Sequence, residues 1–231
     1  EACRDRLAFQ HGISRDRIEL LPNFVDLERF RPRSALPERP ARALVFSNHA
    51  TEGTTLPVIR AACEAESIAL DVAGSGFGRV LDRPEETLGN YDLVFARARG
   101  ALEAMAVGAA VITCDFPGLG GFVSPERFDE WRRLNFGLRC LRRPLEADAL
   151  RSEIRAYDPA AAAAASRRVR CEAGLDAAVQ KIVKIYLQVI DGSLGPAAGL
   201  STLLLLATGA GPLAAQRALG AGADGGAGLG G

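Results

Sequence analysis

The sequence is poor in the residues from which metal sites and covalent cross-links are built. Its 231 residues include two histidines, His11 and His49, and five cysteines that are widely spread and never form a Cys-x-x-Cys pair. Two histidines cannot make a His-rich metal site, and the cysteine spacing indicates neither a zinc site nor a disulfide framework. We therefore expect no bound metal, and a reducing, cytoplasmic location.

The sequence also lacks an excess of either charge and a long apolar run. It holds 28 basic and 28 acidic residues, so no nucleic-acid-binding stripe is indicated and nucleic acid is not expected as a partner. The apolar stretch Leu200–Ala207 is too short to cross a bilayer. Because residues 192–216 carry no charge, association with a membrane surface, at its inner face, stays open as an alternative.

The apolar residues, 48% of the chain, suffice for a large core and are organised around Tyr91–Asp115. Leu93–Phe95 and Ala109–Cys114 are typical of buried strands. Between them, five residues at helical spacing form one apolar face: Ala98, Ala101, Leu102, Met105 and Ala106. Gly108 follows the last of these, where a helix end favours glycine. This pattern predicts a right-handed crossover between two parallel strands.

The same alternation extends toward both ends of the chain. Strands at Ala43–Ser47 and Ala69–Ala73, with helices between and after them, predict an α/β fold with a doubly wound parallel sheet. We also expect short strands at Ile18–Leu21 and Leu138–Leu141, a glycine loop at Phe116–Phe122, and C-terminal helices at Leu145–Ala156, Ala160–Cys171 and Leu175–Ile190.

Composition divides the chain into three parts. Residues 1–40 contain Pro22, Asn23, Pro37 and Pro40 and are interpreted as an interdomain segment and linker. Residues 41–190 form the α/β domain. Residues 191–231 are a Gly/Ala-rich tail that we expect to be disordered and to add little to the core.

Glu103 is the unusual residue of the central unit. It lies about one turn into the predicted helix, beside the apolar stripe, and helical side chains lean toward the N-terminus. Its carboxylate is therefore expected near the carboxyl end of the preceding strand, where ligands bind in open α/β sheets. The alternative is a solvent-exposed helix glutamate that complements the helix dipole.

Other candidate residues follow the predicted strands. Gly74 and Gly76, in a Gly-Ser-Gly-Phe-Gly loop, are candidates for a phosphate loop, with a tight turn as the alternative. The loop lacks the third glycine of a dinucleotide fingerprint, and we expect no cofactor. Asn48 and His49 follow another strand, where either a binding role or ordinary polar surface is consistent with the pattern.

Two arginines complete the candidate site. Arg97 and Arg99 flank the predicted helix N-terminus, where two guanidinium groups and a helix dipole suit a diphosphate, although one of them is expected to be only a surface charge. No Asp-x-Asp pair occurs, so a diphosphate would be neutralised by arginine and backbone dipoles instead of a chelated metal. Asp115, at the end of the second central strand, is placed to face the same cleft.

Several of these segments resemble the C-terminal half of GT-B glycosyltransferases. The stretch LLPNFVDLERFRP, Leu20–Pro32, is similar to their interdomain motif I-P-N-G-V-D-x-x-x-F-x-P, with Phe24 in place of the glycine. ALEAMAVGAAVI resembles their donor-site helix E-A-M-A-x-G-x-P-V-I, with Ala110 in place of the proline. The loop at Gly74–Gly78 and the closing Ile185-Tyr186 also match in order, from about Ile13 to Ile190.

The resemblance implies a Rossmann-like domain that binds a nucleotide diphosphate sugar and transfers the sugar to an unknown acceptor. It assigns the ribose hydroxyls to Glu103, and the diphosphate to the glycine loop and nearby basic groups. The acceptor-binding N-terminal domain of the family is missing, so the chain is expected to be the donor half and incomplete as an enzyme. Phe95 stands where the retaining branch carries an earlier glutamate, which leaves the stereochemical outcome open.

Two other functions remain as alternatives. A nucleotide-sugar 2-epimerase has the same fold but is expected to carry more carboxylates and histidines in its cleft. A non-catalytic nucleotide-binding α/β domain would need only the binding residues. The sequence does not decide the sugar, the base or the acceptor.

Overall fold

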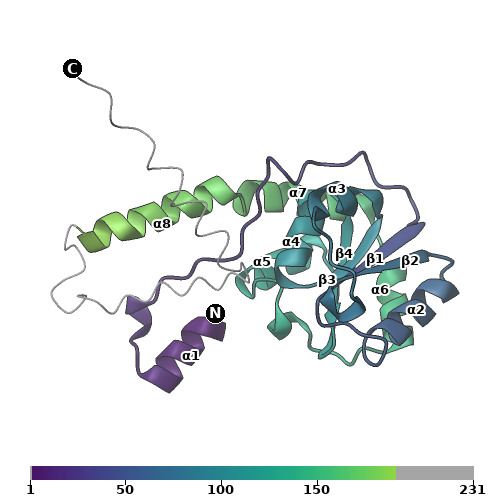
Figure 1. Cartoon of the computed structure of the whole chain (residues 1–231), viewed down its shortest axis with the longest axis horizontal. Coiled ribbons are helices and arrows are strands. Elements are labelled where there is room, and N and C mark those ends of the chain that lie inside the picture. The colour runs from purple at the N-terminus through teal and green to yellow at the C-terminus, as the bar shows by residue number, and fades with distance from the viewer. Residues whose placement is uncertain (1, 191–231) are drawn as a thin grey trace, which may run out of the picture.

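The computed structural model describes residues 2–190, and the tail predicted at 191–231 lies outside the described residues. The described part forms five strands and eight α-helices (Figure 1). The strands are β1 (Arg42–Phe46), β2 (Ala69–Ala73), β3 (Leu93–Ala96), β4 (Ala110–Asp115) and β5 (Gly118–Phe122). The helices are α1 (Ala2–His11), α2 (Leu56–Ala65), α3 (Pro84–Thr87), α4 (Ala98–Ala106), α5 (Pro125–Arg133), α6 (Ala147–Arg155), α7 (Pro159–Glu172) and α8 (Leu175–Ile190).

The five strands form one sheet in the order β2-β1-β3-β4-β5. Strands β1 to β4 are parallel, and β5 runs antiparallel to β4. The chain therefore builds outward from β1 in both directions, which places a topological switch point between β1 and β3. The α/β class and the largely parallel sheet are confirmed.

Helices cover both faces of the sheet, and each face has its own apolar cluster. On one face Leu44, Val94 and Val111 pack with residues of α4, α5 and α7. On the other face Val45, Phe95 and Ile112 pack with residues of α2 and α6. Alternate residues along β1, β3 and β4 thus serve opposite clusters, and the central strands are buried on both sides, as a doubly wound sheet requires.

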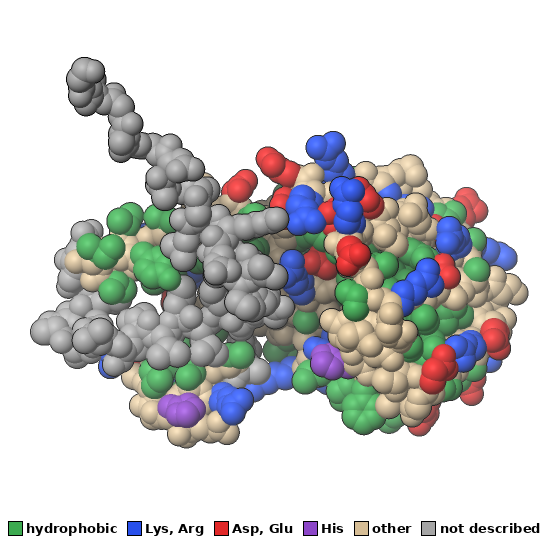
Figure 2. Space-filling view, in the orientation of Figure 1, with side chains coloured by type: hydrophobic (Ala, Val, Ile, Leu, Met, Phe, Trp, Pro, Cys, Tyr) green, Lys and Arg blue, Asp and Glu red, His purple; other side chains and the backbone are tan. Residues whose placement is uncertain are grey.

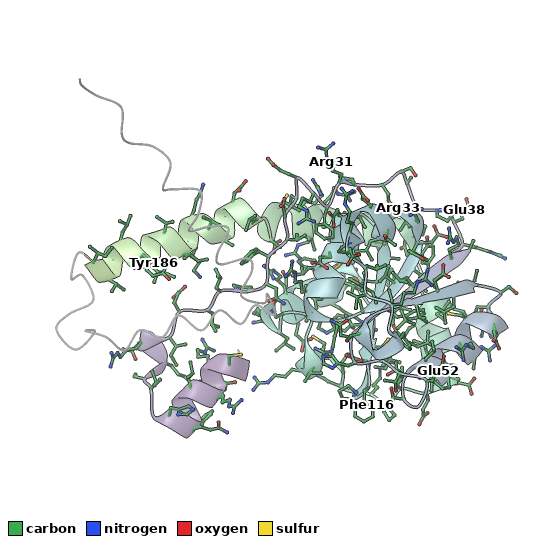
Figure 3. The ribbon with its side chains drawn as sticks, viewed as in Figure 1. Arg31, Arg33, Glu38, Glu52, Phe116 and Tyr186 are labelled. Carbon is green, nitrogen blue, oxygen red and sulfur yellow. The ribbon has the colours of Figure 1, made fainter. Side chains whose placement is uncertain are left out.

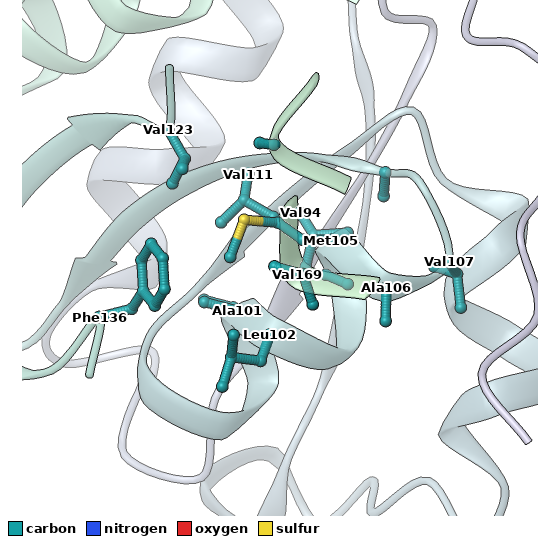
Figure 4. Packing of buried hydrophobic residues seen from close by; sticks show 14 of the residues in the cluster. Val94, Ala101, Leu102, Met105, Ala106, Val107, Val111, Val123, Phe136 and Val169 are labelled. Carbon is teal, nitrogen blue, oxygen red and sulfur yellow. The ribbon is translucent and has the colours of Figure 1, made fainter. Parts of the chain in front are cut away.

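The central unit has the predicted form. Helix α4 joins the parallel strands β3 and β4, and its buried side includes Ala101, Leu102 and Met105. Figure 4 shows Met105 among Val94, Val111 and Val169, between the sheet and α7. Gly108 has a φ of +88° just after the helix, which is the left-handed geometry predicted for its end.

The predicted loop at Phe116–Phe122 is wrong, because residues 118–122 form β5. Its three glycines permit very close packing that side chains would block. A Cβ at Gly118 would lie 2.5 Å from the Arg143 carbonyl oxygen, and one at Gly120 would lie 2.3 Å from Thr113 Oγ1. A Gly-rich sequence is typical of a turn. Here, the small size of glycine allows β5 to fit beside β4.

Two other predicted strands are absent from the described residues. Leu138–Cys140 forms a 3-10 turn instead of the edge strand expected at Leu138–Leu141, and the bridge from this region to β5 comes from Arg143, which pairs with Leu119. Ile18–Leu21 is not a strand either, and a 3-10 turn at Arg15–Arg17 precedes it. Within the described residues, this segment pairs with no strand of the sheet.

The segment 20–33 packs firmly on the α/β domain. Val25 donates its N–H to the Ala173 carbonyl (2.8 Å), and its own carbonyl accepts from Leu175 N (3.0 Å). Phe30 is buried in the core, and Arg170 Nη1 donates to its carbonyl (2.9 Å). Residues assigned by composition to a linker therefore cover the α4 and α7 side of the core.

Helices α1 and α8 lie at the periphery. In Figures 1 and 3, α8 extends away from the sheet, and Tyr186 is labelled along its length. Lys181 on α8 donates to the Leu20 carbonyl (2.9 Å), which ties the helix to the N-terminal segment. Of the helices that the structure describes between residues 2 and 190, none has the length and apolar character needed to cross a membrane.

Candidate functional site

A pocket of about 380 Å³ opens where β1, β3 and β4 end. Its lining includes Ser47, Asn48 and His49 after β1, Arg97, Arg99 and Glu103 around the start of α4, and Asp115 at the end of β4. In Figure 3, the labelled residues Glu52 and Phe116 lie at one edge of the domain. They follow β1 and β4, so this is the edge at which the pocket opens. The pocket thus occupies the switch point of the sheet, where ligands bind in this architecture.

The pocket contains five of the seven residues predicted to bind a ligand. Asn48, His49, Arg97, Arg99 and Glu103 all line it. Gly74 and Gly76 do not, because they lie behind the loop that follows β1.

Glu103 is buried, with 6% of its surface exposed. Its Oε1 accepts a hydrogen bond from Arg99 Nε at 2.7 Å. Burial raises the pKa of Glu103 above its ordinary value, and the charge and hydrogen bond of Arg99 only partly offset this. The alternative of a solvent-exposed glutamate is therefore wrong, and the carboxylate is a partly desolvated acceptor at the pocket wall.

Arg97 is held by the other carboxylate of the pocket. Asp115 is 1% exposed, and its Oδ2 pairs with Arg97 Nε. Its Oδ1 accepts from Ser47 Oγ (3.2 Å) and from the Phe116 N–H (2.9 Å). Four groups from β1, α4 and β4 are thus joined at the base of the pocket, and neither arginine is an isolated surface charge.

The start of α4 is shaped by two unusual backbone features. Ala98 has a φ of +51°, and its N–H donates to the Phe136 carbonyl at 2.7 Å. A Cβ at Gly100 would lie 3.0 Å from the Phe46 ring, so glycine lets the first turn approach β1 closely. The N–H groups of a first helical turn have no acceptor within the helix and form the positive end of its dipole. In α4 that end faces the pocket.

The glycine loop supports the pocket from behind. Gly74 has a φ of +146°, and a Cβ there would lie 1.8 Å from the Ser47 carbonyl oxygen. A Cβ at Gly76 would lie 2.3 Å from the Ala50 carbonyl oxygen. The loop is fastened to the β1 exit by a hydrogen bond from Ser75 N to Asn48 Oδ1 (3.0 Å). These glycines permit close backbone packing, which corresponds to the tight-turn alternative.

No protein-family model matches this chain, and no curated protein matches it. Within residues 2–190, no group of three or more His, Cys, Asp or Glu side chains is placed to hold a metal ion. The pocket can hydrogen-bond a ligand through its carboxylates, its two guanidinium groups and the N-terminus of a helix.

Sequence reasoning missed three contributors to this site. Ser47 is the polar residue directly after β1, a position that signals a strand exit but not a bond to Asp115. Gly100 lies in the first turn of α4, and no local pattern indicates its close approach to the Phe46 ring. Pro84 lines the pocket from α3, and no local pattern indicates that α3 lies over the end of β3.

A second pair of charges lies near Glu103. Arg29, from the segment 20–33, donates from Nε and Nη2 to Glu85 Oε1 at 3.2 and 2.5 Å. The Glu85 side chain is 8% exposed. Glu85 raises the pKa of Glu103 and Arg29 lowers it, after the larger effects of burial and Arg99. The N-terminal segment thus contributes to the electrostatics of the pocket.

Figure 2 shows how charge is distributed over the visible face of the domain. Basic and acidic side chains are interspersed there, and neither sign forms a continuous stretch. The same balance holds inside the pocket, where each arginine has a carboxylate partner.

Proposed function

We propose that this chain is the donor-binding half of a GT-B-type glycosyltransferase, which holds a nucleotide diphosphate sugar and transfers its sugar to an acceptor. One observation carries the proposal: a buried glutamate, Glu103, lies one turn inside a helix whose N-terminus faces a pocket at the switch point of the sheet. A nucleotide diphosphate presents the matching groups, a ribose diol beside two phosphates. The resemblance of residues 13–190 to the family adds independent support.

Glu103 would accept hydrogen bonds from the two vicinal hydroxyls of the ribose. A carboxylate suits this role because it is an acceptor only and has two oxygens. Its burial strengthens such bonds, since little water competes for the carboxylate. An α4 residue at this depth reaches the pocket wall without blocking the helix N-terminus.

The diphosphate would lie at the start of α4. The first-turn N–H groups and the guanidinium groups of Arg97 and Arg99 supply positive charge there. During transfer the bond between the anomeric carbon and the diphosphate oxygen breaks, and the bonding electrons leave with the diphosphate. Positive groups fixed around that oxygen stabilise the developing negative charge.

Calorimetric titration with UDP, GDP and uridine tests this proposal. We expect the chain to bind at least one nucleoside diphosphate, and Glu103→Gln to weaken that binding about ten- to a hundredfold, as loss of hydrogen bonds to a charged acceptor implies. Arg97→Ala should weaken the diphosphate more than uridine. The matched control is Glu172→Gln, which neutralises another glutamate four residues after an arginine, on α7 and outside the pocket.

The outcomes are distinct. If the wild-type chain binds none of these nucleotides, the proposed function is wrong. If Glu103→Gln binds every nucleotide as the wild type does, the pocket does not use Glu103 for ribose. The Glu172→Gln control should match the wild type in either case.

A further inference from the structure

The positive groups that would bind a diphosphate are already paired in the free protein. Arg97 pairs with Asp115, and Arg99 pairs with Glu103. The pocket therefore presents balanced charge to an incoming ligand, although a diphosphate carries at least two negative charges. An incoming diphosphate therefore competes with these carboxylates for the two guanidinium groups.

The two pairs differ in how easily they open. Asp115 is 1% exposed and also accepts from Ser47 and the Phe116 N–H, so Arg97 belongs to a network that fastens β1 to β4. The Arg99 side chain is 50% exposed, and it contacts Glu103 through Nε alone. Arg99 can therefore leave its partner with little disturbance of the fold.

Helix stability does not account for Arg99. A basic residue in the first turn of a helix is unfavourable beside the positive end of the dipole. The order of the pair, arginine four residues before glutamate, is also the weaker orientation for a helical ion pair. The structure thus retains an arginine where the helix itself would favour another residue, directly on the carboxylate assigned to ribose.

We propose that Arg99 is the residue by which the pocket discriminates nucleoside diphosphates from nucleosides; this inference rests on the proposed function. In the free protein Arg99 occupies the Glu103 carboxylate. A nucleoside whose two hydroxyls bind Glu103 competes with Arg99 for that carboxylate and offers Arg99 no new partner. A diphosphate accepts Arg99, which releases Glu103 for the ribose hydroxyls.

The charges around Glu103 make Arg99 the only suitable partner for this exchange in the described part of the chain. Three charged side chains influence Glu103, namely Arg99, Arg29 and Glu85. Arg29 is already bound to Glu85 through two of its nitrogens. Only Arg99 both contacts Glu103 and lies in the lining of the pocket.

Arg99→Ala tests the inference by moving two affinities in opposite directions. The variant should bind uridine or guanosine about two- to fivefold more tightly than the wild type, because the half-exposed ion pair no longer occupies Glu103. It should bind the matching diphosphate about fivefold or more weakly, because a charge-assisted contact is lost. Titrations at pH 7 and pH 9 show whether protonation of Glu103 contributes to the difference, since removing Arg99 favours the protonated form.

The control is Arg168→Ala, which removes another arginine four residues before a glutamate, on α7 and outside the pocket. It should leave both affinities unchanged. If Arg99→Ala binds nucleoside and diphosphate more weakly at both pH values, Arg99 positions Glu103 and the discrimination is wrong. If wild-type protein binds no nucleotide at all, the proposed function fails first, and the two failures are therefore distinguishable.

Discussion

At the scale of single residues, Glu103 shows both the reach and the limit of sequence reasoning. Its place beside the apolar stripe of α4, near the end of β3, follows from helical spacing. Its burial does not, because burial depends on the first turn of α4, on α3, and on the segment that carries Arg29. Of these three, only the first turn of α4, which includes Arg99, is close to Glu103 in the sequence.

Burial of Glu103 predicts a specific dependence of stability on pH. Because its pKa is raised in the folded protein, Glu103 binds protons more readily when folded than when unfolded. Its contribution to the free energy of unfolding is therefore fully present below pH 4.5, the ordinary value, and is lost as pH rises through the raised pKa.

Urea unfolding of the wild type and Glu103→Gln across pH 4 to pH 8 measures this effect. Relative to the variant, the wild type should become less stable as pH rises, with a constant difference once Glu103 is fully ionised. Glu172→Gln, on the exposed part of α7, should show no such trend. A wild type that gains stability over Glu103→Gln as pH rises would contradict the burial of Glu103.

At the scale of elements, the β3-α4-β4 unit could be predicted because each of its signals is local. Buried strands, an apolar helical face and the stop at Gly108 all lie within 25 consecutive positions, residues 91–115. The antiparallel strand β5 could not be predicted, since its glycines have low strand propensity and are explained only by distant neighbours. Arg143 and Thr113 contact the positions where side chains would stand.

The loop after β2 provides an element-scale prediction, because two of its glycines differ in what surrounds them. Gly74→Ala should destabilise the fold by about 3 kcal/mol or more, since its Cβ would meet the Ser47 backbone at 1.8 Å and its φ of +146° is strained for alanine. Gly78→Ala should cost only about 1 kcal/mol, because its φ is +65° and nothing lies within 4 Å of the added Cβ.

Chemical denaturation of both variants, with nucleotide titration of each folded protein, distinguishes these costs. Gly78→Ala should keep the wild-type affinity, since only the backbone of its own turn changes. Equal destabilisation by the two substitutions would show that the loop does not press against the β1 exit as described.

At the scale of the whole molecule, the order β2-β1-β3-β4 brings the ends of three strands together and creates the pocket. This much follows from the chain order of strands and helices and the handedness of parallel connections. The covering by segment 20–33 does not, because Pro22 and Asn23 indicate irregular backbone without indicating what it contacts. Val25 and Phe30 are in fact part of the core that supports α4.

The most direct test of the account compares a nucleoside diphosphate with its 2′-deoxy analogue on the wild type and on Glu103→Gln. If Glu103 binds the ribose diol, the wild type should favour the ribonucleotide about tenfold, the factor that one hydrogen bond to a charged group implies. Glu103→Gln should bind the two ligands with nearly equal affinity. A preference for ribose that is equally strong in both proteins would contradict the central claim.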